Sequence, residues 1–142
     1  MTKEEKELLL KDLCARLPYG VKLGFYASAT KQTYVCTLLG LEPNDDEEEE
    51  ERGPIIAKTE NGYFYMLAGN VKPYLFPLSS MSEEQQKEFD QLIELELKAI
   101  NDEIAHIQVT TFEVDFYNKN HFDYRGLIEK GLAIDASGLN IY

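Results

Sequence analysis

The chain has 142 residues, of which 44% are hydrophobic, and its formal net charge is -12, from 14 Lys and Arg against 26 Asp and Glu. A chain of this length can bury roughly 70% of its unfolded surface. Length and composition therefore argue against a disordered protein and predict one domain over residues 1–142. The negative charge argues against direct nucleic-acid binding, because phosphates would be repelled.

The cysteine count and the hydropathy favour a reducing, cytoplasmic location. Cys14 and Cys36 are too few for a disulfide framework. No apolar stretch of signal-peptide length follows a basic segment at the start, and no stretch approaches the roughly 20 apolar residues that span a bilayer. We therefore expect a cytoplasmic protein without a membrane partner.

The first expected element is a helix that ends at Pro18. Thr2 and Glu5 have the spacing of a capping box. Asp12 and Arg16 stand four residues apart, in the order that favours an ion pair worth about 0.2–0.5 kcal/mol on an exposed face, so we expect them in solvent. Apolar residues recur at three- and four-residue steps and mark one buried face. This face consists of Leu9, Leu10, Leu13, Cys14 and Leu17.

Two hairpins are expected next, because the hydrophobic period changes to two. Residues 21–38 alternate on both sides of a turn at residues 29–31. Residues 55–67 alternate around Asn61 and Gly62, a pair that supplies the positive φ of a tight turn. Together they predict a four-stranded antiparallel meander.

An acidic run from Asp45 to Glu51 separates the two hairpins. Its like charges repel one another, which favours a mobile, solvated loop over residues 43–53. A cation site is the first alternative, but the run lacks the glycine and the alternating ligands of an EF-hand loop. A nucleic-acid mimic is the second alternative, and it would require the charges to be held rigidly.

Residues 71–81 contain two prolines, Pro73 and Pro77, which remove backbone donors and predict an edge strand or a connector. The aromatic residues of this segment could form a groove that binds a peptide. Alternatively, they cover the open end of the core, which is the more common use of aromatic residues between prolines. The interaction surface would consist of Lys72, Tyr74, Phe76 and Met81.

A long helix follows, and Ser82 with Gln85 has capping-box spacing at its start. Its apolar stripe predicts packing on the sheet. A coiled-coil dimer seam is the alternative, although the pattern lasts only about three heptads. The stripe consists of Phe89, Ile93, Leu97, Ile100 and Ile104.

Two short helices are expected near the carboxyl end. Residues 108–117 fit a helix or a strand, and the capping-box spacing of Thr110 and Glu113 favours the helix. Asp123 has the character of an N-cap for a helix over residues 124–130. The glycine that follows suits a left-handed C-cap with its hydrophobic contact.

The densest chemistry lies in the same segment, where His121 and Asp123 could act as a base with an orienting carboxylate. We nevertheless assign no catalytic residue, because Asp123 is engaged as a cap and the segment has no serine or cysteine nucleophile. His106 and His121 lack the spacing of two metal ligands on one helix face. The sequence therefore implies neither a metal nor a cofactor.

Arg125 would place a cation in the first turn of a helix, against the helix dipole, so we expect an anion beside it. In one interpretation the anion is a bound phosphate or carboxylate, held at the helix start with Lys119, His121 and Tyr124. In the other, Arg125 forms an internal salt bridge or donates to a carbonyl. The 26 acidic residues favour the internal partner.

Three segments resemble a family of small proteins encoded by gut bacteria of the Bacteroides type and their prophages. They are residues 1–22 (MTKEEKELLLKDLCARLPYGVK), 71–84 (VKPYLFPLSSMSEE) and 118–136 (NKNHFDYRGLIEKGLAIDA). The resemblance covers less than half of the chain. It implies a cytoplasmic, mobile-element setting, and it implies no activity.

The sequence thus predicts an α+β domain with an N-terminal helix, a four-stranded antiparallel meander, a long helix packed on the sheet and short C-terminal helices. The favoured function is a small acidic, non-enzymatic protein that binds or regulates another protein. One alternative is a small enzyme or ligand-binding protein with a site around His121, Tyr124 and Arg125. The other is the nucleic-acid mimic.

Overall fold

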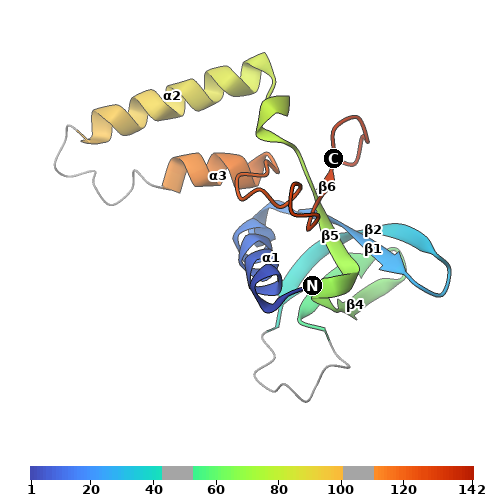
Figure 1. Cartoon of the computed structure of the whole chain (residues 1–142). Coiled ribbons are helices and arrows are strands. Elements are labelled where there is room, and N and C mark those ends of the chain that lie inside the picture. Colours follow the sequence, from blue (N-terminus) through green and yellow to red (C-terminus); the bar gives the residue numbers. More distant parts are fainter. Residues whose placement is uncertain (43–52, 101–110) are drawn as a thin grey trace.

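A six-stranded sheet organises the part of the chain that the computed structural model describes, which comprises residues 1–42, 53–100 and 111–142 (Figure 1). The acidic run and Thr110, on which two predictions depend, lie outside these ranges. The strands are β1 (Lys22–Ala27), β2 (Gln32–Leu41), β3 (Ile55–Thr59), β4 (Gly62–Met66), β5 (Val71–Leu75) and β6 (Ile134–Asp135). The helices are α1 (Lys3–Arg16), α2 (Glu83–Ile100) and α3 (Thr111–Lys119), with 3₁₀ turns η1 (Leu17–Tyr19), η2 (Ala68–Asn70) and η3 (Leu78–Ser80).

The α+β class is confirmed, but the expected four-stranded antiparallel meander is wrong in extent. The strand order is β4-β3-β2-β1-β5-β6, and β6 runs parallel to β5. The two predicted hairpins are present, with φ 55° at Lys31 and φ 121° at Gly62 in their turns. The proline-containing segment was expected as an edge strand or a connector, yet β5 lies between β1 and β6. Pro73 removes one donor, but carbonyl acceptors remain, and the pairing with β6 covers only two residues.

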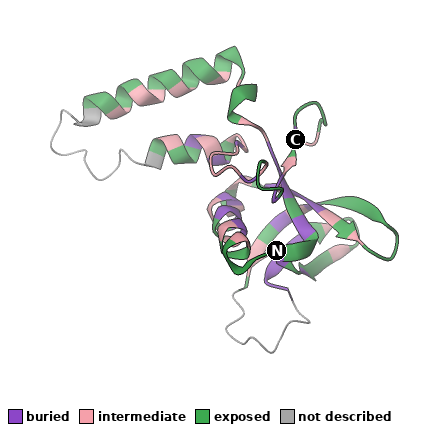
Figure 2. Cartoon of the chain, in the orientation of Figure 1, coloured by how far each residue is buried: buried purple, intermediate pink, exposed green. Residues whose placement is uncertain are grey.

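Helix α1 covers part of one sheet face and provides one side of the core (Figures 1 and 2). Its capping box is confirmed, because the Glu5 amide donates to Thr2 Oγ1 at 3.1 Å and the Thr2 amide donates to Glu5 Oε2 at 2.8 Å. The expected apolar face is displaced, and Cys14 is exposed. The buried residues of α1 are Leu9, Asp12, Leu13 and Arg16.

Helices α2 and α3 form an arm that extends away from the sheet, so the expected packing of the long helix on the sheet is wrong (Figure 1). Phe89 of α2 packs against Phe116 and Tyr117 of α3, with ring centroids 5.4 and 5.5 Å apart. Leu95 and Leu97 are more than half exposed. One facing helix covers only part of a wide apolar stripe, which explains this exposure.

The two ends of the arm meet at the sheet. The chain leaves it at Phe76 and returns beside the same residue, where the Phe76 amide donates to the His121 carbonyl and the Asp123 amide donates to the Phe76 carbonyl, both at 2.8 Å. The Ser82–Gln85 capping box that starts α2 is confirmed. Residues 111–117 are helical, which confirms the favoured assignment for that part of residues 108–117.

The helix expected over residues 124–130 is wrong, because only one turn forms there. Gly126 has φ 70°, a left-handed conformation that interrupts any helix begun at Tyr124. The remaining turn ends in the predicted left-handed cap at Gly131, whose amide donates to the Ile128 carbonyl at 3.0 Å. The next amide donates to the Leu127 carbonyl at 2.9 Å, which completes a Schellman motif.

Candidate functional site

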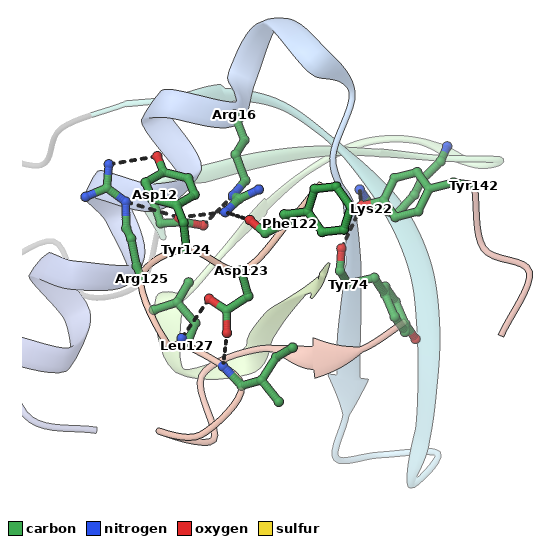
Figure 3. Close-up of polar contacts among 11 residues, drawn as sticks. Asp12, Arg16, Lys22, Tyr74, Phe122, Asp123, Tyr124, Arg125, Leu127 and Tyr142 are labelled. Atoms are coloured by element: carbon green, nitrogen blue, oxygen red, sulfur yellow. Dashed lines mark hydrogen bonds and ion pairs between the residues drawn. The ribbon is translucent and has the colours of Figure 1, made fainter. Parts of the chain in front are cut away.

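A buried ion pair joins α1 to the carboxyl-terminal segment (Figure 3). Asp12 and Arg16 are both fully buried, and Arg16 Nε donates to Asp12 Oδ2 at 2.7 Å. Arg16 Nη2 donates to Asp12 Oδ1 at 3.1 Å and to the Phe122 carbonyl at 2.7 Å. The expectation that this pair lies in solvent is therefore wrong. Burial of a charged pair requires such hydrogen bonds to offset its desolvation.

The sequence contains a signal for this burial. Leu9, Asp12, Leu13 and Arg16 stand at positions i, i+3, i+4 and i+7 of one helix, so they share a face. The positions of Leu9 and Leu13 on this face are sufficient to predict that Asp12 and Arg16 are buried with them. Leu10 and Leu17 lie beside this face and are half-buried. Because the predicted buried face included them, it was displaced from Asp12 and Arg16.

Asp12 is also the anion that faces Arg125. Arg125 Nε lies 3.3 Å from Asp12 Oδ1, in an ion-pair contact that lacks hydrogen-bond geometry. Arg125 Nη2 donates to the Tyr124 hydroxyl at 3.0 Å. The guanidinium carbons of Arg125 and Arg16 lie 4.8 and 5.3 Å from the Tyr124 ring centroid. The internal salt bridge is thus present, whereas binding of an external anion stays a prediction.

Asp123 holds the turn that follows this cluster (Figure 3). Its two carboxylate oxygens accept from the amides of Leu127, at 2.8 Å, and Ile128, at 2.9 Å. The capping role predicted for Asp123 is correct in kind, although it serves one turn rather than a helix. Asp123 therefore orients the backbone of this turn, while His121 Nδ1 is buried without a hydrogen-bond partner among the described residues.

His121 lies next to the cluster and stacks on Tyr142, with ring centroids 3.8 Å apart and an angle of 11° between the rings. Its backbone has φ 61°, a left-handed conformation that few residues other than glycine adopt. Burial, assisted by the nearby charges of Arg16 and Lys22, lowers the pKa of His121 from 6.5 to about 4. His121 is therefore neutral at pH 7.

The Tyr142 hydroxyl links the carboxyl-terminal segment to two strands by hydrogen bonds. It accepts from the Lys22 amide of β1 at 3.0 Å and donates to the Tyr74 carbonyl of β5 at 2.8 Å (Figure 3). Burial raises the pKa of this hydroxyl to about 12, although the bond from the Lys22 amide and the charge of Arg16 oppose the shift. The hydroxyl therefore stays protonated at physiological pH.

The other predicted site residues have separate positions. Lys119 is exposed at the end of α3, and Lys72 is exposed on β5. Tyr74 is buried. Phe76 is half-buried and packs against Phe122 and Tyr142, with centroids 6.4 and 5.8 Å away. Tyr124 and Arg125 share a side-chain hydrogen bond, and the Phe76 amide donates to the His121 carbonyl. A ligand-binding role for the whole set stays a prediction.

A groove of about 550 Å³, absent from the sequence-based expectations, lies at the ends of the two hairpins. Phe25 and Tyr34 face each other across β1 and β2, and Phe64 belongs to β4. Each precedes or follows a buried residue by two positions, namely Leu23, Cys36 and Met66. Because strand side chains alternate, these three rings lie on the core face of the sheet, beyond the part that α1 covers, whereas Val35 and Tyr65, which also line the groove, alternate to the other face.

Element lengths explain why this face is left open. Strand β2 has 10 residues and spans about 34 Å, whereas α1 has 14 residues and spans about 21 Å. One such helix cannot cover the full length of the hairpins. The long helix was expected to cover the rest of this face, but α2 extends away from the sheet (Figure 1).

Comparisons with protein-family models, with curated proteins and with solved structures find no match to this chain. Among residues 1–42, 53–100 and 111–142, no group of three or more His, Cys, Asp or Glu side chains could hold a metal ion. No helix in the same ranges is long and apolar enough to cross a membrane.

We expect Arg16→Met to lower the free energy of unfolding by about 3–5 kcal/mol, because it leaves the buried Asp12 with only the weaker contact to Arg125. Urea denaturation measures the loss. Lys11→Met is the matched control, because Lys11 is exposed on the same helix, and its effect should stay within about 0.5 kcal/mol. Equal effects of the two substitutions would show that the buried ion pair contributes little.

His121 predicts a specific acid sensitivity. Between pH 6.5 and about 4 the unfolded chain binds a proton at this histidine and the folded chain does not, so the free energy of unfolding falls as pH falls. His121→Asn removes this titration and tolerates the left-handed backbone. Urea denaturation at both pH values should show a smaller loss for His121→Asn than for the wild type. The same loss in both proteins would contradict the lowered pKa.

Proposed function

We propose that this chain is a small non-enzymatic cytoplasmic protein that binds another protein through the groove at the hairpin ends. The observation that carries the proposal is the exposure of aromatic rings on the core face of the sheet. Tyr34 is 44% exposed and Phe64 is 45% exposed, and both line the groove. Exposed aromatic rings that gather on one face of a sheet are candidate sites of interaction, and on this basis we infer that the groove receives a partner.

The size and composition of the groove support this proposal. Its volume of about 550 Å³ lies within the range of ligand-binding clefts, and its lining combines aromatic rings with the polar side chains of Thr59, Glu60 and Asn61. Phe25 at its floor packs against the core. The Phe25 ring is therefore supported by the core, which limits the entropy that this side chain loses when a partner binds.

The internal use of the polar residues also supports a binding role over catalysis. Asp12, Arg16 and Arg125 are engaged with one another, and Asp123 is engaged with backbone amides. A catalytic carboxylate or base has to reach a substrate within hydrogen-bond distance. Asp123 and Arg125, two of the residues considered for chemistry, thus have internal partners, which supports the groove as the contact surface.

Adjacent aromatic residues of β4 provide the test. Phe64 opposes Ala57 on the groove face, whereas Tyr63 opposes Lys58 on the other face and is 70% exposed. We expect the tagged wild type and Tyr63→Ser to recover the same protein from a native lysate, and we expect Phe64→Ser to lose it. Unchanged far-ultraviolet circular dichroism would show that each variant folds.

Two outcomes would contradict the proposal. One is recovery of the same protein by Phe64→Ser at the level of the wild type, which would place the contact elsewhere. The other is the absence of any protein that the wild type recovers reproducibly. Loss of the partner by both variants would point to the outer face of β4 and would also contradict a groove contact.

A further inference from the structure

We propose that the groove binds an arginine or lysine side chain from a basic, extended segment of the partner. The cation would lie over the aromatic rings and beside Glu60. This inference rests on the proposed function and adds the chemistry of the partner to it. Aromatic faces attract organic cations through the negative charge of their π systems, and a nearby carboxylate strengthens the attraction.

The rings are placed to receive such a side chain. Phe25 and Tyr34 oppose each other on neighbouring strands, and Phe64 approaches from the second hairpin. The Tyr34 hydroxyl lies 3.2 Å from Thr30 Oγ1 and 3.1 Å from Gln32 Oε1, at the turn of the first hairpin. The long apolar stem of an arginine or lysine would pack along these rings while its charged end reaches the rim.

The charge of the groove selects the partner. Among the groove residues that the structure describes, Glu60 carries the only charge, and it is exposed in the turn between β3 and β4. Lys58 precedes it by two residues but opposes Tyr63 on the other face of the sheet. The chain as a whole has a net charge of -12, which attracts a basic segment from a distance.

The same charge argues against the other occupants of an apolar groove. A second copy of the chain would bring another net charge of -12 against the first, and this repulsion opposes self-association. A purely apolar segment would gain nothing from the carboxylate of Glu60, whereas a cationic side chain would be attracted to it. A basic segment satisfies both the rings and the carboxylate.

Peptide binding tests the inference directly, because the chain contains no tryptophan. A short peptide with arginines on both sides of one tryptophan can therefore be followed by its own fluorescence. A second peptide carries glutamine in place of each arginine. We expect the arginine peptide to bind the full-length protein at least about tenfold more tightly than the glutamine peptide.

A pair of glutamates provides the matched control. Glu60→Gln and Glu83→Gln remove the same charge, but Glu83 is exposed at the start of α2, outside the groove. We expect Glu60→Gln to weaken the arginine peptide by about fivefold and Glu83→Gln to leave its affinity within twofold of the wild type. Phe64→Ser should weaken it at least as much as Glu60→Gln.

Three results would overturn the inference. Equal weakening by the two glutamate variants would show a diffuse attraction to net charge rather than a site. Equal affinity for the arginine and glutamine peptides would show that the groove does not select cations. Sedimentation of the wild type as a dimer that Phe64→Ser converts to a monomer would assign the groove to a second copy. If the lysate experiment still recovers a groove-dependent partner, the proposed function stands and only the cationic chemistry fails.

Discussion

The carboxylate of Asp12 connects parts of the chain that are far apart in sequence. It accepts two hydrogen bonds from Arg16 on its own helix and faces Arg125 near the carboxyl end. Arg16 in turn donates to the carbonyl of Phe122. A carboxylate buried this deeply is stable only with cationic partners, so the position of the last segment is constrained by the charge at the core.

The rest of the architecture follows from that attachment. Because residues 121–125 are held against α1, the arm of α2 and α3 leaves and rejoins the rest of the fold at neighbouring residues, Phe76 and His121. Tyr142 then fixes the tail across β1 and β5. The elements that the sequence suggested as a cover for the sheet are used elsewhere, which leaves the hairpin ends and their aromatic rings exposed.

Local signals were predictable from the sequence, and long-range ones were not. The capping boxes at Thr2 and Ser82, the two hairpins and the left-handed glycine at Gly131 depend on a few neighbouring residues, and they are confirmed. The helix after Asp123 failed because Gly126 adopts a left-handed conformation that no periodicity reveals. For Arg125 the expected anion is present, but the reason was wrong, because the helix dipole that seemed to require it does not form. The partner, Asp12, lies more than a hundred residues earlier in the chain. Patterns among neighbouring residues cannot predict a contact across that separation.

A double-mutant cycle between Asp12 and Arg125 tests the central claim most directly. Asp12→Asn, Arg125→Met and the combined variant would be unfolded in urea beside the wild type, and the coupling free energy would be obtained from the four values. An attachment through Asp12 predicts a favourable coupling of about 0.5–3 kcal/mol. A coupling of zero within about 0.3 kcal/mol would show that the two residues contribute independently, and the carboxylate would not hold the carboxyl-terminal segment in place.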